Sequence, residues 1–166
     1  MIEIIRADIA TLNVDAIVNP ANEALMQGGG ACGAIHQAAG PELAEATRKF
    51  GGCATGGAVI TPGFKLPAHF VIHAVGPIWK GGGEREAELL RAAYRSAFAV
   101  AMTEPSIRSI AFPAISTGIF AYPKDAAAAI AVDVMRENEK SFDQIVACLY
   151  DDETMALYER LLDSYG

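Results

Sequence analysis

The sequence predicts an α/β fold, a three-layer α/β/α sandwich in which a central mixed sheet of roughly six strands lies between helices. Short apolar runs typical of buried strands alternate along the chain with longer segments that have the 3.6-residue hydrophobic period of helices. Glycine, proline and asparagine mark the connections between these segments. Because no internal repeat, low-complexity tract or interdomain linker interrupts the pattern, residues 1–166 are expected to form one domain.

The first half of the chain contains four predicted strands and two predicted helices. The second strand pattern is short, and Asn19 is expected to leave the strand. Gly40 and Pro41 separate the two helices, because proline breaks the first and suits the first turn of the second. The strands are expected at residues 2–7, 15–18, 58–61 and 70–74, and the helices at residues 32–39 and 41–49.

The second half continues the alternation with two more strands and three helices. Leu90, Tyr94 and Ala97 belong to an apolar stripe that predicts a helix from residue 84 to about residue 103. The last predicted strand is nearly all apolar, which indicates burial on both faces. Strands are expected at residues 109–112 and 144–150, and further helices from Pro123 through 126–134 and at residues 152–163.

Composition and charge restrict the class of protein. The chain has 166 residues, of which 52% are hydrophobic and 20% charged, enough for a sizeable buried core. Its formal net charge of −7 lacks the basic face that neutralises many phosphates, which disfavours nucleic acid as the principal partner. No apolar run is long enough to span a bilayer and no signal pattern is present, so we expect no membrane association and a cytoplasmic location.

Cysteine and histidine spacing favours neither disulfides nor a metal. Cys32, Cys53 and Cys148 are widely spaced and form no Cys-x-x-Cys pair, which is typical of free thiols in a reducing compartment. His69 and His73 would share a face of a strand that includes both, but the sequence offers no third ligand. We therefore expect no metal and no cofactor.

A glycine-rich stretch follows the second predicted strand. Gly28, Gly29 and Gly30 precede a predicted helix that Gly33 opens, and glycine lets a ligand approach the backbone closely. Several N–H groups at a helix start can bind a phosphate-like anion without lysine or arginine. A flexible turn is the alternative. The Gly-x-Gly-x-x-Gly spelling does not indicate a dinucleotide fold, because nine residues separate it from the strand.

A second loop, residues 116–120, connects an apolar strand to a helix. The hydroxyl and N–H groups of Ser116, Thr117 and Gly118 can hold a second phosphate, although an ordinary strand–helix connection has the same pattern. A serine hydrolase would use Ser116 as its nucleophile. That reading is poor because Ala114 replaces the first glycine of the nucleophile motif and no histidine follows Ser116.

Several blocks in a fixed order carry a resemblance to a known family. They are Asp-Ala-Ile-Val-Asn-x-Ala-Asn from Asp15, Gly-Gly-Gly-x-x-Gly-Ala-Ile-His-x-Ala-Ala-Gly from Gly28, the segments 55–63, 71–77 and 112–118, and Tyr-Asp-Asp-Glu from Tyr150. Together they resemble the macro domain, an ADP-ribose-binding module, and most closely its MacroD-type ADP-ribosyl hydrolases. The resemblance implies a single macro domain over residues 1–166 that binds ADP-ribose. It also implies hydrolysis of O-acetyl-ADP-ribose or removal of mono-ADP-ribose from protein.

The resemblance also implies where ADP-ribose would lie. Adenine is expected between Asp8 and Tyr150, the diphosphate between the two loops, and the distal ribose near Asn19, Asn22 and Phe120. As alternatives to contacting adenine, Asp8 can be a turn or N-cap residue, and Tyr150 can be a strand-end tyrosine with its hydroxyl in water. The expected ligand-binding residues are Asp8, Ile9, Asn19, Asn22, Gly28, Gly29, Gly30, Ala31, Cys32, Gly33, Ser116, Thr117, Gly118, Ile119, Phe120 and Tyr150.

Cys32 departs from the family pattern, because MacroD-type hydrolases have aspartate at this point. A thiol cannot simply replace a carboxylate, so a small filler against the ligand is one interpretation and a nucleophile assisted by His36 is another. Asn22 and Cys32 are the candidate catalytic residues, Asn22 through its contact with the distal ribose. The departure favours the alternative of a non-catalytic ADP-ribose reader, and a binder of nucleic acid or poly(ADP-ribose) is a third hypothesis.

Overall fold

The computed structural model describes residues 1–165, and in these residues one six-stranded sheet has the strand order β1-β6-β5-β2-β4-β3. All neighbouring strands are parallel except β3, which runs antiparallel to β4 at one edge. The mixed sheet expected from the sequence is confirmed. The strands are β1 (Ile2–Arg6), β2 (Ala16–Ala21), β3 (Ala58–Pro62), β4 (Phe70–Val75), β5 (Ser109–Phe112) and β6 (Gln144–Leu149).

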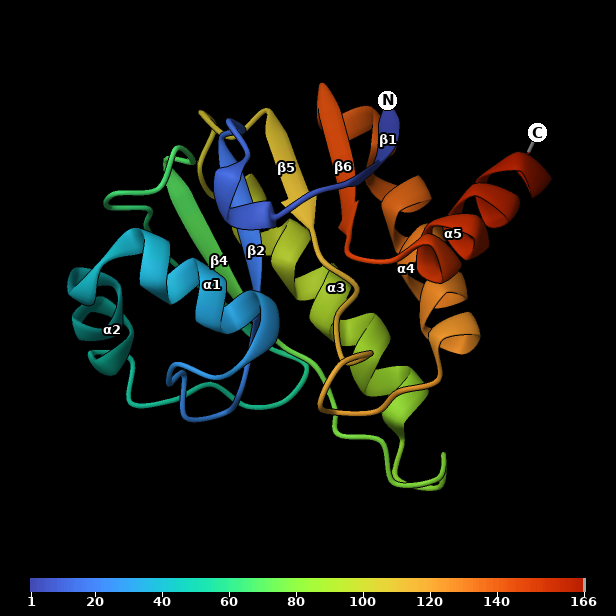
Figure 1. Ribbon diagram of the computed structural model, residues 1–166, viewed down its shortest axis with the longest axis horizontal. Helices are drawn as coiled ribbons and strands as arrows, with labels where there is room; N and C mark the ends of the chain where they lie inside the picture. Colours follow the sequence, from blue (N-terminus) through green and yellow to red (C-terminus); the bar gives the residue numbers. More distant parts are fainter. Residues whose placement is uncertain (166) are drawn as a thin grey trace.

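Helices cover both faces of the sheet, in the expected three layers (Figure 1). On one face, α1 and α2 pack with a short 3₁₀ segment, η1, over a core that includes Ile17, Val71 and Val146. On the other face, α3, α4 and α5 pack over a larger core that includes Ile72, Phe112 and Ala147. The helices are η1 (Ile9–Thr11), α1 (Gly30–Ala39), α2 (Pro41–Arg48), α3 (Glu86–Met102), α4 (Lys124–Asn138), η2 (Glu139–Ser141) and α5 (Asp152–Ser164).

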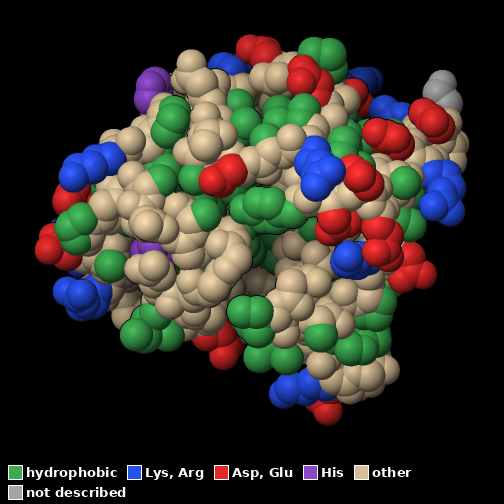
Figure 2. Space-filling view, in the orientation of Figure 1, with side chains coloured by type: hydrophobic (Ala, Val, Ile, Leu, Met, Phe, Trp, Pro, Cys, Tyr) green, Lys and Arg blue, Asp and Glu red, His purple; other side chains and the backbone are tan. Residues whose placement is uncertain are grey.

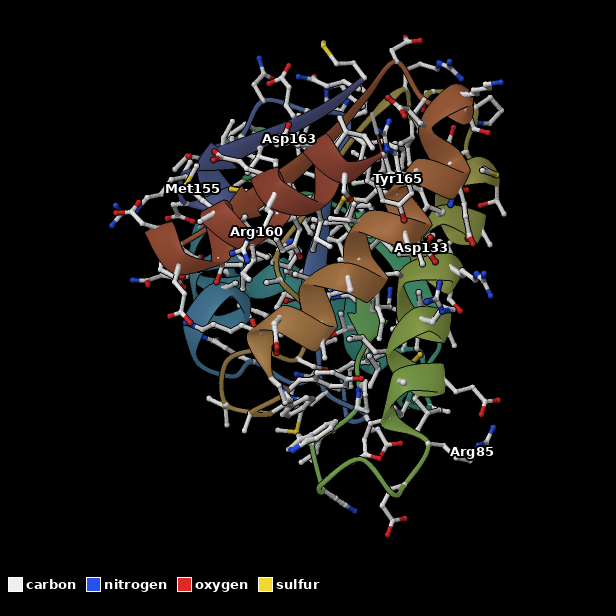
Figure 3. All side chains as sticks on the ribbon, turned by 90° about the vertical axis from the view of Figure 1, so that its right-hand side faces the viewer. Arg85, Asp133, Met155, Arg160, Asp163 and Tyr165 are labelled. Atoms are coloured by element: carbon white, nitrogen blue, oxygen red, sulfur yellow. The ribbon has the colours of Figure 1, made fainter. Side chains whose placement is uncertain are left out.

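The last helix is tied to its neighbour by polar contacts as well as by apolar packing. Tyr165 follows α5 and donates a hydrogen bond to Asp133 on α4 at 2.9 Å (Figure 3). The guanidinium of Arg136 lies 5.0 Å from the centre of the Tyr165 ring. These contacts fix the C-terminal end of α5 against α4.

Strand β2 is longer than expected, because it continues through Asn19 and Pro20 to Ala21. It pairs with β4 along its whole length, but with β5 only at Ala16 and Ile17. Beyond Ile17, β2 is therefore an edge on its β5 side. Proline is tolerated at such an edge because its missing N–H leaves no partner unsatisfied. The separation of β2 from β5 opens a gap at the carboxyl ends of the central strands, where the order of the parallel strands reverses.

The other differences from the expected elements are small. Helix α1 begins at Gly30 rather than residue 32, and β6 ends at Leu149, so Tyr150 stands in the following loop. Trp79, expected in an exposed loop, is half buried against the ring of Tyr122, with ring centres 4.8 Å apart. Among residues 1–165, no helix combines the length and apolar character needed to cross a membrane.

Candidate functional site

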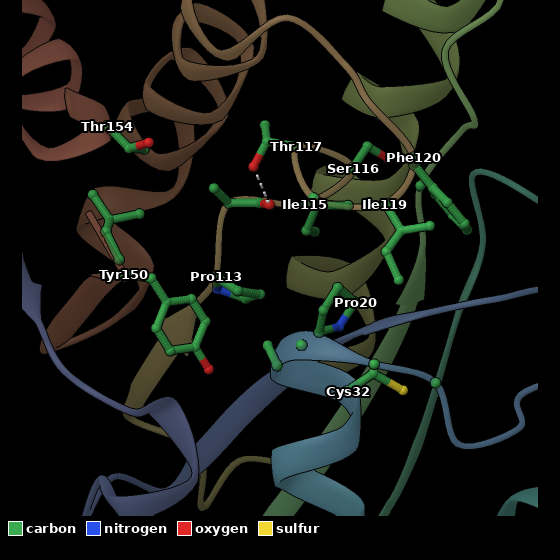
Figure 4. Close-up of a pocket in the computed structure, with 18 of the residues that line it drawn as sticks. Pro20, Cys32, Pro113, Ile115, Ser116, Thr117, Ile119, Phe120, Tyr150 and Thr154 are labelled. Carbon is green, nitrogen blue, oxygen red and sulfur yellow. Dashed lines mark hydrogen bonds between the residues drawn. The ribbon is translucent and has the colours of Figure 1, made fainter. Parts of the chain in front are cut away.

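The gap between β2 and β5 forms the floor of a cavity of about 600 Å³ (Figure 4). Its walls come from the end of β2, the start of α1 and the loops after β5 and β6. Two of these walls are the loops singled out from the sequence. The lining residues are Pro20, Ala21, Asn22, Gly28, Gly29, Gly30, Ala31, Cys32, Gly76, Pro113, Ala114, Ile115, Ser116, Thr117, Gly118, Ile119, Phe120, Lys124, Cys148, Leu149, Tyr150, Asp151 and Thr154.

The first wall is the glycine loop, residues 28–33, which runs into helix α1. No side chain caps this helix at Gly29, so the first-turn N–H groups face the cavity wall without a side-chain acceptor. Gly30 has a φ of +57°, a conformation that glycine adopts at little cost. A Cβ at Gly33 would lie 2.6 Å from the carbonyl oxygen of Gly28, so only glycine allows the loop to fold back this closely.

The second wall is the serine loop, residues 116–120, which lies across the cavity from the glycine loop. In the described chain, Ala121 and Tyr122 donate their N–H groups back into this loop, whereas the N–H groups of Gly118, Ile119 and Phe120 have no acceptor. The Thr117 hydroxyl donates to the carbonyl of Ala114 at 3.0 Å (Figure 4). Ile119 is 84% exposed and reaches to within 3.4 Å of where a Gly29 Cβ would be, so the two loops nearly meet.

Ser116 has an unusual conformation for a residue with a side chain. Its φ is +69°, and its hydroxyl is buried without a hydrogen-bond partner, with the residue only 6% exposed. The hydroxyl occupies space that exists because residue 76 is glycine, since a Cβ there would lie 2.2 Å from Ser116 Oγ. A strained backbone and an unpaired buried donor are features that binding sites tolerate when a ligand provides the missing partner.

Buried side chains hold the serine loop from below. The Tyr94 hydroxyl on α3 accepts the N–H of Ile115 at 3.0 Å and donates to the carbonyl of Pro113 at 3.4 Å. Burial raises the pKa of Tyr94 to about 12, so it stays a neutral donor. Trp79 donates its backbone N–H to the carbonyl of Phe120 at 2.8 Å, which fixes the other end of the loop.

Glu86 anchors the segment that carries Trp79. Its carboxylate is 1% exposed and accepts the N–H groups of Lys80, Gly82 and Glu84 at 2.6–2.9 Å. Burial alone would raise the pKa of this carboxyl, but the hydrogen bonds outweigh burial and lower it to about 2. The residue was expected only as part of a helix, and nothing in its sequence context distinguishes it from the other acidic residues at helix starts.

The cavity carries little charge. Of the lining residues in the part of the chain that the structure describes, Lys124 is the one basic residue and Asp151 the one acidic residue. The Lys124 Nζ lies 3.5 Å from a carboxylate oxygen of Asp151. Asp151 also caps α5 by accepting the N–H of Thr154 at 2.7 Å. A negatively charged ligand would therefore be held mainly by backbone N–H groups rather than by basic side chains. The face shown in Figure 2 mixes acidic and basic side chains and carries no continuous basic surface.

Asn22 and Cys32 lie together at the glycine-loop end. The Asn22 amide closes a short turn by accepting the N–H of Met26 and donating to its carbonyl, both at 3.0 Å. The Cys32 thiol, 5% exposed, donates to the same carbonyl at 3.8 Å. Both residues line the cavity, but within residues 1–165 no histidine or carboxylate has a hydrogen bond with the thiol. Their catalytic roles therefore stay predictions.

Tyr150 lies at the opposite end of the cavity from Phe120 (Figure 4). It is 49% exposed, so one face of its ring is available for stacking. Burial, and then the nearby Asp8 carboxylate, raise the pKa of its hydroxyl. The position fits the expected adenine end of the site, and the stacking role stays a prediction.

Four expected ligand-binding residues do not line the cavity: Asp8, Ile9, Asn19 and Gly33. Asp8 caps η1 by accepting the N–H of Ala10 at 3.0 Å, which is the alternative role considered for it. Ile9 is 1% exposed and belongs to the core under α1. Gly33 contributes by leaving room for the Gly28 carbonyl, which lets the glycine loop fold back closely. Direct ligand contacts by these residues stay predictions.

The family resemblance placed Asn19 at the distal ribose, and Asn19 was also expected to leave the strand. It lies in β2 instead and belongs to a buried polar group: its Nδ2 donates to Nδ1 of His73 at 2.9 Å, and Nε2 of His73 pairs with the Thr61 hydroxyl at 3.0 Å. Burial, and then the neighbouring His36, lower the pKa of His73 to about 3, so the ring is neutral. His36 is also buried, and among the described residues its Nε2 has no partner.

Several lining residues were missed by sequence reasoning. Gly76 and Cys148 fall within strand and turn patterns that predict core packing and carry no sign of a cavity. Lys124, Asp151 and Thr154 stand at helix starts next to the two loops, and their closeness to the strand ends could have indicated them. Among residues 1–165, no group of three His, Cys, Asp or Glu side chains is arranged to hold a metal.

A doubly covered mixed sheet with a cavity of about 600 Å³ between two glycine-bearing loops is typical of an α/β module that binds its ligand at the carboxyl ends of the strands. The family model described as Macro domain matches residues 18–131. The chain belongs to the macro domain family.

Relatives and solved structures agree with this assignment. The chain is 55% identical to a macro domain-containing protein of Ralstonia nicotianae, over 96% of this chain and 92% of the relative. It is 52% identical to the O-acetyl-ADP-ribose deacetylase of Citrobacter rodentium, over 99% of this chain and 97% of that protein. An Oceanobacillus iheyensis macrodomain solved with ADP matches with a TM-score of 0.92 at 38% identity, covering 99% and 90% of the two chains.

Proposed function

We propose that this chain binds ADP-ribose in the cavity and hydrolyses O-acetyl-ADP-ribose, or the related linkage of mono-ADP-ribose to protein. The observation that carries the proposal is the pair of facing loops whose N–H groups lack acceptors, in a protein with a net charge of −7. The name of the Citrobacter relative supports the deacetylase reaction. A Trypanosoma brucei macrodomain solved with ADP-ribose supports the ligand; it is 35% identical, with a TM-score of 0.88, covering 97% of this chain and 68% of that one.

The proposed pose follows the length of the cavity. Adenine stacks on Tyr150, and its amine donates a hydrogen bond to the carboxylate oxygen of Asp8 that does not cap η1. The diphosphate lies between the glycine loop and the serine loop, where backbone N–H groups and the Ser116 hydroxyl donate hydrogen bonds to its oxygens. The distal ribose lies near Asn22 and Phe120.

The proposed chemistry needs little from side chains. Water attacks the acyl carbonyl carbon, the ester C–O bond breaks, and the products are the free acid and ADP-ribose. Asn22 orients the ribose for this attack. Because position 32 is a cysteine rather than a carboxylate residue, a phosphate oxygen of the substrate accepts a proton from the attacking water. The leaving ribose oxygen takes up a proton and becomes a hydroxyl of the product ADP-ribose.

The second candidate function is an ADP-ribose reader with the same cavity and no turnover. Cys32 favours it, because the thiol is buried and donates to the Met26 carbonyl, and has no base partner. The two functions differ only in whether the bound ester is hydrolysed.

Two measurements test these proposals. Calorimetric titration should show ADP-ribose binding more tightly than AMP or NAD, and no binding of ADP-ribose would contradict both functions. Single-turnover assays on O-acetyl-ADP-ribose and on mono-ADP-ribosylated protein then separate them. Release that is lost in Asn22→Ala supports the enzyme, whereas tight binding without release supports the reader. An affinity that falls steeply with salt would instead indicate a nucleic acid or poly(ADP-ribose) binder.

A further inference from the structure

A second, smaller hollow adjoins the cavity at the end away from Tyr150. Its volume is about 240 Å³, and it shares Asn22, Gly76 and Phe120 with the main cavity. Its other lining residues are Glu23, Thr55, Val75 and Ile78. We call this hollow the side pocket.

We propose that the side pocket receives the acyl group carried on the distal ribose, and that it selects neutral acyl chains longer than acetyl over acidic ones. The proposal rests on the proposed function, which puts the distal ribose beside Asn22 and Phe120. Those two residues form the border between the main cavity and the side pocket. A group attached to the ribose there is directed into the pocket.

The size of the side pocket exceeds what an acetyl group needs. A site for one water molecule requires roughly 10–15 Å³ measured in this way, and the pocket has about 240 Å³. An acetyl group adds only two carbons and one oxygen beyond the ester oxygen. Propionyl and butyryl chains therefore fit without any change of the walls.

The walls of the side pocket are partly apolar, so a longer hydrocarbon chain should bind more tightly than a shorter one. Val75 is buried, and Phe120 and Ile78 provide further apolar surface. Full burial of one methylene raises affinity about fourfold. Because Ile78 is 54% exposed and the pocket is open to solvent on that side, we expect about twofold per methylene.

The walls are held by hydrogen bonds, so the pocket is a built feature rather than a gap between loose loops. The Glu23 carboxylate accepts both the N–H and the hydroxyl of Thr55, at 3.2 and 3.0 Å. Residues Gly56 and Gly57 exchange backbone hydrogen bonds with Val75 at 2.8 and 3.0 Å. The opposite wall is fixed by the Trp79 bond to Phe120 and by the Glu86 contacts described above.

The charge of the pocket gives it a preference between acyl groups. Among the described residues that line the pocket, Glu23 is the one charged residue, so an acyl chain that ends in a carboxylate meets a like charge with no lining cation beside it. Interactions between exposed charges change equilibria by up to about fivefold. A succinyl chain should therefore react more slowly than a butyryl chain of the same length.

The test measures kcat/KM for O-acetyl-, O-propionyl-, O-butyryl- and O-succinyl-ADP-ribose by chromatography of the released ADP-ribose. We expect butyryl to exceed acetyl about fourfold, and succinyl to fall severalfold below butyryl. Ile78→Trp fills the pocket and should lower the butyryl-to-acetyl ratio below that of the wild type. Glu23→Gln keeps an acceptor for Thr55 and should bring the succinyl-to-butyryl ratio close to one.

Matched controls lie outside the pocket. Met102→Trp adds the same bulk at an exposed site at the end of α3, and Glu159→Gln removes an exposed carboxylate of α5; neither should change the ratios. Equal rates for acetyl and butyryl in the wild type, or ratios that the pocket variants leave unaltered, would overturn the proposal.

The test also separates this proposal from the proposed function. If no ester is hydrolysed, the deacetylase function fails, and the same four compounds are then compared as ligands by calorimetry. Tighter binding of butyryl than of acetyl, lost in Ile78→Trp, would still support the pocket. Equal affinities would overturn it.

Discussion

Gly76→Ala is the substitution whose effect follows most directly from the geometry of the site. The added Cβ would lie 2.2 Å from Ser116 Oγ and 2.5 Å from Ile115 Cγ2, where carbon contacts normally need about 3.5–4.0 Å. Either the serine loop or the end of β4 must shift by about 1 Å. Overpacking of this kind costs about 1–3 kcal/mol of folding stability.

The same shift should weaken ligand binding. Moving the serine loop by about 1 Å removes at least one N–H hydrogen bond to a phosphate, each worth about 1.5–3 kcal/mol. The affinity for ADP-ribose should then fall about 10- to 150-fold. Chemical denaturation measures the stability of the variant, and calorimetric titration measures its affinity.

Gly83→Ala is the matched control. Its Cβ would meet nothing within 4 Å, and its backbone is in an ordinary conformation, so stability and affinity should stay at wild-type values. A Gly76→Ala protein with wild-type stability and affinity would refute the claim that this glycine makes room for Ser116. Reduced stability with unchanged affinity would contradict the expected shift of the serine loop.

Four further predictions concern single side chains. Ser116→Ala removes a buried hydroxyl that has no hydrogen-bond partner. Denaturation should show a stability equal to that of the wild type or higher by about 1–3 kcal/mol, and a lower stability would contradict this. Titration should show weaker binding of ADP-ribose. Tyr150→Ala should weaken AMP and ADP-ribose alike, by about 1–3 kcal/mol of lost stacking, and an unchanged AMP affinity would exclude stacking. Cys32→Asp should raise the single-turnover rate on O-acetyl-ADP-ribose, and an unchanged rate would show that a carboxylate there is not the missing part. His73 has a pKa of about 3 in the folded protein and about 6.5 in the unfolded chain. Between these pH values the unfolded chain binds one more proton than the folded protein, so the stability falls as the pH falls. The loss is about 2 kcal/mol from pH 6.5 to pH 5. Denaturation at each pH measures this slope, and a His73→Gln protein that keeps the full slope would contradict the assignment.

The elements of the fold were largely predictable because strands and helices differ in the period of their apolar residues. Where the prediction failed, a tertiary contact decided the outcome. Asn19 and Pro20 have the character of loop residues, yet they extend β2 because β4 pairs with them and β5 does not. The sequence pattern cannot show how far a neighbouring strand accompanies its partner.

The two loops of the site were also predictable, because glycine and hydroxyl residues between a strand and a helix favour an anion. The importance of Gly76 was not, since it depends on the position of Ser116, forty residues further along the chain. The role of Asp8 was likewise not predictable from the sequence. Its carboxylate had two plausible roles, and only the coordinates show that one oxygen caps η1.

The floor of the cavity comes from the divergence of β2 and β5, and therefore from the path of the main chain itself. Exchange of individual side chains along the rim, such as Ile119 or Ile78, leaves that floor unchanged. A new preference for the group attached to the distal ribose can therefore arise by a single mutation at the rim, while binding of the ADP portion of the ligand is kept. Small-molecule inhibitors aimed at the floor would meet a surface that exchanges of these rim side chains do not alter.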